Sequence, residues 1–476
     1  MNPKDFRKHA HELVDWMADY LEKKDSFPVT PNLKPGSIKS KLPEKAPDEG
    51  EAFNKIMSEF NSIILPGMTH WQHPKFFGYF PANSSPPSVL AEMLTATLGA
   101  QCMSWLTSPA ATELEERMAD WLRDAKGLDP SWKGVIQDTA STATLCALLT
   151  AREKFSKYQI NKKGFDGYGK FRVYSSTHVH SSIDKSLMVA GIGKENLVRI
   201  EVDEHFAMVP EALESAIKED LAAGFTPLCV VSALGTTSST AIDPVADISD
   251  VCEQFGIWHH IDAAYAGTAL LLPEYRWMIK GHEKADSYVF NPHKWMFTNF
   301  DCTLLYLKEP QYLVNTFSLT PEYLKTASDG EVNNYRDWGI QLGRRFRALK
   351  LWFVIRSYGL QGIRNKLYFH LQLTQLAKSW IEAEGSLEIV APVPLNTICF
   401  RYVEKNASLD QLNDFNARWM DAVNQTGEAF FSHTKLNGQF VIRWVIGQTD
   451  VEEKHIQEAW SLLLEKLGSI TPIDLP

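Results

Sequence analysis

Between about residues 134 and 308, short apolar runs with the character of β-strands alternate with amphipathic helical stretches. The apolar runs read GVIQ, FRVYSS, NLVRIEV, PLCVVSALG, GIWHHID, SYVFNP and CTLLYLK, and helical patterns such as VPEALESAIKEDLAAG lie between several of them. This alternation predicts a mostly parallel sheet with helices on both faces, because parallel neighbours need crossover connections. The predicted fold class is therefore α/β, with ligands at the carboxyl ends of the strands.

The regions that flank this alternation predict a helix before it and a smaller domain after it. Residues 3–23 carry apolar side chains at helical spacing, and a Pro- and Lys-rich linker follows. A lone amphipathic helix cannot bury its own stripe, so it must pack on the main body of the chain or on a second copy, and of these we expect a homodimer. A further helix is expected over 108–126, with Ser108 as N-cap and Pro109 at its first position. The expected domains are an N-terminal helical dimerisation segment, a large cofactor domain and a small α+β domain, over residues 1–85, 86–352 and 353–476.

The composition excludes several classes of function. The chain has 476 residues, a formal net charge of −10 and no basic stripe, which argues against nucleic-acid binding. Its six cysteines form no pair with zinc-ligand spacing, so no metal site is expected. The charged N-terminus lacks the apolar core of a signal peptide, and no apolar run is long enough to span a membrane. We expect a cytoplasmic protein without membrane contact.

Five small polar segments follow the predicted strands. They are DTASTAT (138–144), THVHSS (177–182), LGTTSS (234–239), HHIDAAYAG (259–267) and NPHKW (291–295). Taken singly, a Thr-rich helix cap, a hydrogen-bonded histidine and a lysine that extends to solvent explain them better than catalysis does. Together they offer a helix N-terminus for an anion, a flat histidine, an acid and a lysine in apolar surroundings, which is the set that pyridoxal phosphate requires. The motifs GxxxxGK[ST], GxGxxG and GxSxG are absent, which disfavours nucleotide-binding and serine-hydrolase alternatives.

The same segments carry a resemblance to a known family. HHIDAAYAG, FNPHKW, VHSSIDKS, LGTT and DWGIQLGRRFRALKLW resemble the group II pyridoxal-phosphate decarboxylases, and among them the aromatic-L-amino-acid decarboxylases, including bacterial members. The likeness runs from the first helix to the C-terminal region. It implies a fold-type I homodimer in which an N-terminal helical flap is exchanged between subunits.

The resemblance also implies roles for particular residues. Lys294 is expected to form the Schiff base with the cofactor, Asp262 to pair with its ring nitrogen and His180 to stack on its ring. Tyr323 matches the loop tyrosine that donates a proton. The other cofactor-binding residues implied are Ala140, Ser141, Thr237, Asn291 and His293. The residues implied for the substrate pocket, which two subunits would share, are Trp71, Tyr79, Phe80, Pro81, Ala82 and Met103.

The reaction that follows from the resemblance is decarboxylation of aromatic L-amino acids to amines and carbon dioxide. An oxygen-using aldehyde synthase is the main rival; such enzymes carry Phe for the loop tyrosine or Asn for the stacking histidine, whereas this chain has Tyr323 and His180. A glutamate decarboxylase and a cofactor-holding protein without turnover are less favoured. Ala82, Asp138 and Thr142 depart from the mammalian pattern of Thr, Gly and an acidic residue. The preferred aromatic amino acid is not specified by the sequence.

Overall fold

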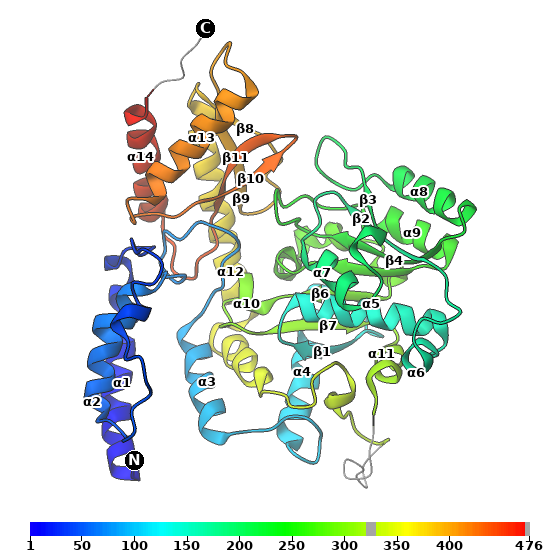
Figure 1. The fold of residues 1–476 in the computed structure, drawn as a ribbon, viewed down its shortest axis with the longest axis horizontal. Coiled ribbons are helices and arrows are strands. Elements are labelled where there is room, and N and C mark those ends of the chain that lie inside the picture. The colour runs from blue at the N-terminus through cyan, green and yellow to red at the C-terminus, as the bar shows by residue number, and fades with distance from the viewer. Residues whose placement is uncertain (320–329, 472–476) are drawn as a thin grey trace. The chain divides into compact units, whose positions relative to one another are not determined.

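The computed structural model describes residues 1–319 and 330–471, and its central feature is a seven-stranded sheet with the order β1-β7-β6-β5-β4-β2-β3 (Figure 1). The α/β class predicted from the sequence is confirmed. The strands are β1 (Lys133–Gln137), β2 (Phe171–Ser176), β3 (Leu197–Ile200), β4 (Thr226–Ala233), β5 (Trp258–Asp262), β6 (Ser287–Phe290) and β7 (Thr303–Leu307).

The strand directions bring the polar segments to one edge of this sheet. Strands β2 to β6 pair in parallel, whereas β7 is antiparallel to both β6 and β1. Strand β1 therefore runs in the same direction as β6, and the carboxyl ends of β1, β2, β4, β5 and β6 share one edge. Strand β7 begins at that edge, so Thr303 lies opposite Gln137 in the register.

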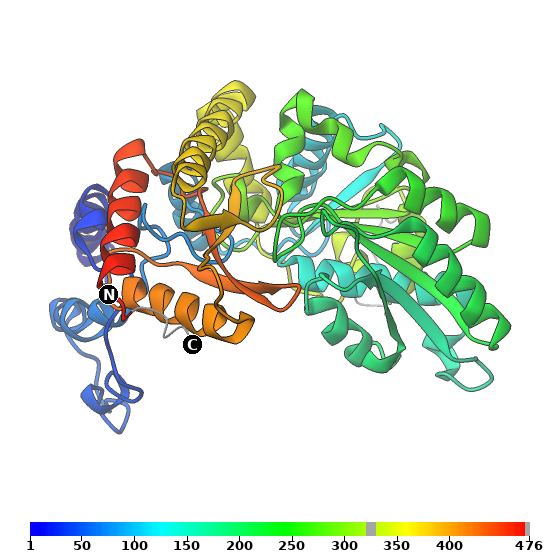
Figure 2. The same cartoon turned by 90° about the horizontal axis from the view of Figure 1, so that it is seen from above.

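Helices cover both faces of the sheet because its strands are apolar on both sides (Figure 2). On one face, α5 (Ala140–Ser156), α7 (Ser182–Val189) and α11 (Pro310–Phe317) pack on a core that includes Val173 and Val231. On the other face, α8 (Pro210–Ala222) and α9 (Val245–Phe255) pack on a core that includes Tyr174 and Val230. Adjacent residues of β2 and β4 thus point to opposite layers, as the pleat requires.

Most of the remaining helices and strands lie before and after this layered region. The helix predicted at the N-terminus is present as α1 (Pro3–Lys23), and the helix predicted after Ser108 is present as α4 (Pro109–Lys126), although no hydrogen bond to the Ser108 side chain caps it. The helices not yet named are α2 (Phe53–Glu59), α3 (Pro86–Leu98), α6 (Ile160–Lys163), α10 (Pro292–Trp295), α12 (Arg347–Ala383), α13 (Leu409–Asn424) and α14 (Glu453–Ser469). A four-stranded sheet has the order β10-β11-β9-β8, formed by β8 (Leu387–Ile389), β9 (Thr397–Tyr402), β10 (Ser432–Leu436) and β11 (Gln439–Val445).

The chain divides into two compact units. The sheet unit comprises Ala82–Thr374 and Ala391–Ile398, and the terminal unit comprises Met1–Pro81, Gln375–Val390 and Cys399–Pro476. The division into three domains, 1–85, 86–352 and 353–476, stays a prediction. No helix among the described residues has the length and apolar character to cross a membrane. All six cysteines are buried, and none of them forms a disulfide bond.

Candidate active site

The loop between β1 and α5 forms a site for an anion. The Oγ of Thr139, the N-cap, accepts a hydrogen bond from the N–H of Thr142 at 3.4 Å. The N–H groups of Ala140 and Ser141 lie in the first turn of α5, where backbone donors have no partner within the helix. Ala140 is half-buried and Ser141 is exposed, so a ligand can reach both. Because the helix dipole also favours negative charge here, this loop is suited to a phosphate group.

Two buried side chains after β6 have one end held and the other end available. The amide oxygen of Asn291 accepts a hydrogen bond from Thr303 Oγ1 at 2.8 Å. The Nδ1 atom of His293 accepts one from the backbone N–H of Cys302 at 2.9 Å. Burial, aided by the charge of Lys294, lowers the pKa of His293 to about 3, so this ring is neutral and its proton is on Nε2. The Asn291 amide group and His293 Nε2 can therefore donate hydrogen bonds to a ligand.

Lys294 and Asp262 come from neighbouring strand ends. Asp262 is the last residue of β5, where it lies beside Val289 of β6, and its Oδ1 accepts the N–H of Ala264 at 3.0 Å. Lys294 follows β6 in the one-turn helix α10 and is partly buried. Burial lowers the pKa of the Lys294 amine, and the negative charge of Asp262 opposes that shift. A lowered pKa increases the fraction of the free amine, which is the nucleophilic form.

His180 lies in the same electrostatic environment as this pair. It follows β2, and its Nδ1 accepts the N–H of Ser182 at 3.1 Å and lies 2.8 Å from Ser182 Oγ. Burial lowers the pKa of His180, the charge of Asp262 raises it, and the charge of Lys294 lowers it. The charges of Asp262 and Lys294 thus act on His180, and the neutral imidazole carries its proton on Nε2.

The loop after β4 contributes the rim of the site. Gly235 has φ = +79°, and a Cβ atom on it would lie 2.8 Å from Ala266 Cβ, so the loops after β4 and β5 approach closely. The hydroxyl of Thr236 is used within the loop, where it accepts the N–H of Ala241 at 3.1 Å. Thr237 is exposed. Of Thr236 and Thr237, Thr237 is therefore the residue whose side chain a ligand can reach.

These groups fit pyridoxal phosphate. The first turn of α5 offers backbone donors for a phosphate, Asp262 offers a carboxylate for a protonated ring nitrogen, and Lys294 offers an amine with a lowered pKa. They follow β1, β5 and β6, whose carboxyl ends share one edge, so one flat ligand along that edge can reach all three.

Several predicted residues remain untested by this arrangement. Tyr323 lies outside the described residues. Ala82 and Met103 belong to the sheet unit, whereas Trp71, Tyr79, Phe80 and Pro81 belong to the terminal unit. Within the terminal unit the rings of Trp71 and Tyr79 stack with centroids 5.8 Å apart, and both are exposed. Their joining with Ala82 and Met103 in one substrate pocket stays a prediction.

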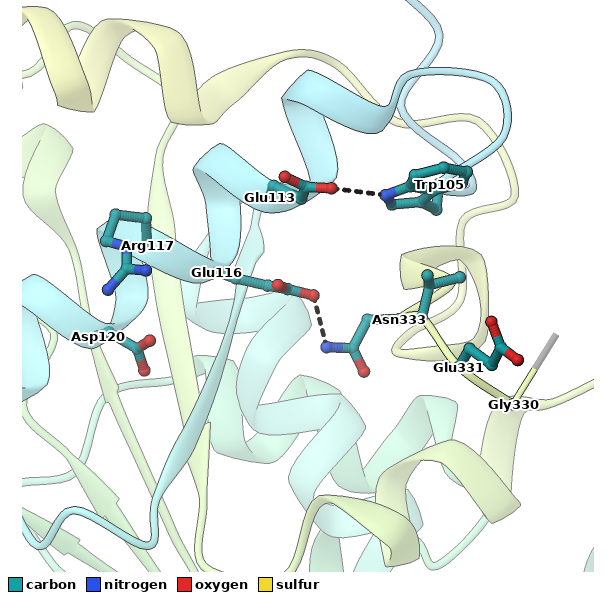
Figure 3. Close-up of a pocket in the computed structure, with 9 residues that line it drawn as sticks. Trp105, Glu113, Glu116, Arg117, Asp120, Gly330, Glu331 and Asn333 are labelled. Atoms are coloured by element: carbon teal, nitrogen blue, oxygen red, sulfur yellow. Dashed lines mark hydrogen bonds between the residues drawn. The ribbon is translucent and has the colours of Figure 1, made fainter. Parts of the chain in front are cut away.

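A surface pocket of the sheet unit includes none of the predicted site residues (Figure 3). It is lined largely by acidic side chains of α4 and by residues 330–333. Two of its carboxylates already have partners, since Glu113 accepts from Trp105 Nε1 at 2.9 Å and Glu116 accepts from Asn333 Nδ2 at 2.6 Å. No lysine is among the described residues that line this pocket, and acidic side chains form much of its lining, so the strand-end groups remain the candidate active site.

Sequence reasoning missed the residues that hold the site residues in place. Thr303 orients Asn291, the backbone of Cys302 orients His293, Ser182 orients His180, and Gln341 contacts Asp138. The hydrogen bond from the backbone N–H of Cys302 cannot be predicted from the residue type, because nearly every residue has such a donor. Thr303, near the start of CTLLYLK, could have been identified from the sequence, because a threonine at the start of a buried strand needs a hydrogen-bond partner.

Comparison with known proteins agrees with the geometry. The profile of the family described as "Pyridoxal-dependent decarboxylase conserved domain" matches residues 35–403. The chain is 40% identical to tyrosine decarboxylase 1 of Narcissus pseudonarcissus over 99% of this chain and 94% of that protein. It is 42% identical to phenylacetaldehyde synthase of Arabidopsis thaliana over 98% of this chain and 96% of that protein. The crystal structure of Catharanthus roseus tryptophan decarboxylase in complex with L-tryptophan matches with a TM-score of 0.93 and 36% identity, over 98% of this chain and 99% of that one.

Proposed function

Because this chain belongs to the pyridoxal-dependent decarboxylase family, we propose that it converts aromatic L-amino acids to the corresponding amines and carbon dioxide. One observation carries the proposal: an anion site, a carboxylate and an amine of lowered pKa lie along one strand edge of the fold shared with tryptophan decarboxylase. The cofactor is pyridoxal phosphate, and a structure of Oryza sativa TDC with PLP and tryptamine matches this chain with a TM-score of 0.95 and 34% identity, over 98% of this chain and 99% of that one.

We propose the following assignments for cofactor binding. The N–H groups of Ala140 and Ser141 bind the phosphate, and Asp262 holds the proton on the ring nitrogen. His180 packs on the ring face, and Lys294 supplies the amine that binds the aldehyde carbon. Asn291, His293 and Thr237 complete the polar contacts. When bound, the cofactor supplies an electron sink for the carbon–carbon bond that breaks.

The protein's own groups then control charge and protons. Asp262, as an anion beside the ring nitrogen, keeps that nitrogen protonated and so favours loss of the carboxyl group. His180 is neutral because burial lowers its pKa, so it covers the ring without adding a competing positive charge. Tyr323 delivers a proton to the α-carbon, which is the step that yields an amine.

An aldehyde synthase is the second candidate, since the chain is also 42% identical to phenylacetaldehyde synthase of Arabidopsis thaliana. Aldehyde production requires that oxygen reaches the α-carbon before a proton does. Tyr323 and His180 favour protonation. The family resemblance implies that aldehyde synthases carry Phe in place of the loop tyrosine or Asn in place of the stacking histidine. Amine is therefore the proposed product.

We further propose that the enzyme is a cytoplasmic homodimer. The helix α3 exposes Leu90, Leu94 and Leu98 at successive turns of one face, with 53%, 47% and 66% of each residue accessible. No residue of α1 is buried, although Trp16 packs on Phe60. Apolar stripes of this kind are typical of surfaces that meet a second subunit.

A panel of amino acids tests the proposed reaction. Purified holoenzyme is incubated separately with Phe, Tyr, Trp, their hydroxylated forms and Glu, and carbon dioxide, amine, aldehyde and peroxide are measured. We expect carbon dioxide and amine in equal amounts from at least one aromatic substrate and none from Glu. Equal amounts of aldehyde and peroxide would favour the synthase, and turnover of Glu alone would contradict the proposed substrate class.

A further inference from the structure

Asp138 places a carboxylate directly before the proposed phosphate site. It is the residue after β1 and precedes the N-cap Thr139, so it lies two residues from Ala140. One oxygen of Asp138 accepts the N–H of Thr139, and the other accepts Nε2 of Gln341 at 3.0 Å. Asp138 is only partly buried. These two hydrogen bonds hold the carboxylate at the entrance to α5.

Among the described residues no salt bridge includes Asp138, whereas the nearby Asp301 pairs with Arg347. The guanidinium of Arg347 binds the carboxylate of Asp301, with Nε to Oδ1 at 2.8 Å and Nη2 to Oδ2 at 3.4 Å. Although burial lowers it, the pKa of Arg347 is raised overall, mainly by Asp301 and then by Cys302 and Asp138, so Asp138 lies within the field of a cation that Asp301 has already paired. Asp138 therefore adds a carboxylate without an ion-pair partner among the described residues next to the first turn of α5.

We propose that Asp138 weakens the binding of pyridoxal phosphate by repelling its phosphate group. The cofactor would then dissociate and rebind more readily than it would without this carboxylate. The inference rests on the proposed phosphate position at Ala140 and Ser141. A phosphate dianion and a carboxylate a few ångströms apart repel each other even in a partly solvated site. The helix dipole and the backbone donors still favour the phosphate, so Asp138 reduces affinity without abolishing it.

The test uses Asp138→Asn, which keeps an oxygen for Thr139 and removes the charge. We expect the dissociation constant for pyridoxal phosphate to fall about tenfold, the factor for one like charge at short range in a partly solvated site. Pyridoxal, which lacks the phosphate, should bind the variant and the parent alike. High salt should reduce the difference for pyridoxal phosphate, since the screening length is about 3 Å at 1 M. Glu219→Gln, which neutralises an exposed carboxylate on α8, is the matched control and should change neither ligand.

Two further outcomes separate this inference from the phosphate assignment. Ser141→Asp puts a charge into the first turn of α5 itself and should abolish tight binding of pyridoxal phosphate while pyridoxal still binds. If Ser141→Asp keeps parental affinity, the phosphate position is wrong and the inference fails with it. If Ser141→Asp behaves as expected but Asp138→Asn leaves the affinity for pyridoxal phosphate unchanged, or shifts pyridoxal equally, the inference about Asp138 alone is overturned.

Discussion

Backbone N–H groups determine which ring nitrogen carries the proton in two histidines of the site. Nδ1 of His180 accepts from Ser182 and Nδ1 of His293 accepts from Cys302. Because burial lowers the pKa of both rings, each is neutral with its proton on Nε2. The identities and positions of both histidines could be predicted from the sequence. Their protonation could not, since it depends on donors that every residue carries.

The charge of Asp262 is expected to decide the rate of decarboxylation. Asp262→Asn keeps the shape and the acceptor for Ala264 but removes the anion that keeps the cofactor nitrogen protonated. We expect kcat to fall by orders of magnitude, whereas Asp262→Glu should do less harm. Steady-state kinetics on the best aromatic substrate measures this. Near-parental kcat in the Asn variant would refute the role of Asp262.

Tyr323 is expected to decide which product forms. Tyr323→Phe keeps the ring and removes only the proton that the phenol donates. We expect carbon dioxide release to persist while the amine yield falls and aldehyde, ammonia and peroxide appear in air. Product analysis under air and under nitrogen separates the two branches. Amine formation at the parental rate without peroxide would show that another group is the proton donor.

At the scale of helices and strands, the five polar segments lie at or directly after the carboxyl ends of β1, β2, β4, β5 and β6, as predicted. Apolar runs bounded by polar turns are strong signals in a parallel sheet, which explains this success. The position of β7 between β1 and β6 was not predicted. It depends on long-range pairing, and it is what brings Thr303 to both Asn291 and the carbonyl of Asp138.

The helix α4 ends with a lysine in an unfavourable place. Lys126 is 0% exposed, its Nζ has no hydrogen-bond partner among the described residues, and it lies over the rings of Phe290 and Tyr288. Burial lowers its pKa well below the ordinary value. The unfolded chain therefore binds more protons than the folded one between the folded pKa and about 10.4, so this residue makes stability rise with pH across that interval.

Lys126→Met should remove the free-energy cost of burying this amine without a hydrogen-bond partner. We expect the free energy of unfolding near neutral pH to increase by roughly 1–3 kcal/mol, the cost of a buried unpartnered polar group. The part of the pH dependence that Lys126 contributes should also disappear. Denaturant unfolding at several pH values measures both effects, and Lys185→Met, at an exposed position on α7, is the control. A less stable Met variant would show that the amine has a favourable partner.

At the scale of the whole molecule, exposed apolar faces favour a dimer. Leu94 on α3 and Leu221 on α8 are both 47% accessible, but only Leu94 belongs to a stripe with Leu90 and Leu98. Leu94→Asp should therefore shift the protein toward monomers, whereas Leu221→Asp should not. Sedimentation velocity over a range of concentrations tests this. Equal behaviour of the two variants would argue against α3 as the interface.

The most direct test of the account is to locate the cofactor chemically. Holoenzyme is reduced with borohydride, digested and sequenced by mass spectrometry, with Lys294→Ala treated in parallel. Because Lys294 combines partial burial, a lowered pKa and a place beside Asp262, we expect the phosphopyridoxyl group on Lys294 and none in the Ala variant. The label on another lysine, or equal labelling of the Ala variant, would contradict the proposed active site.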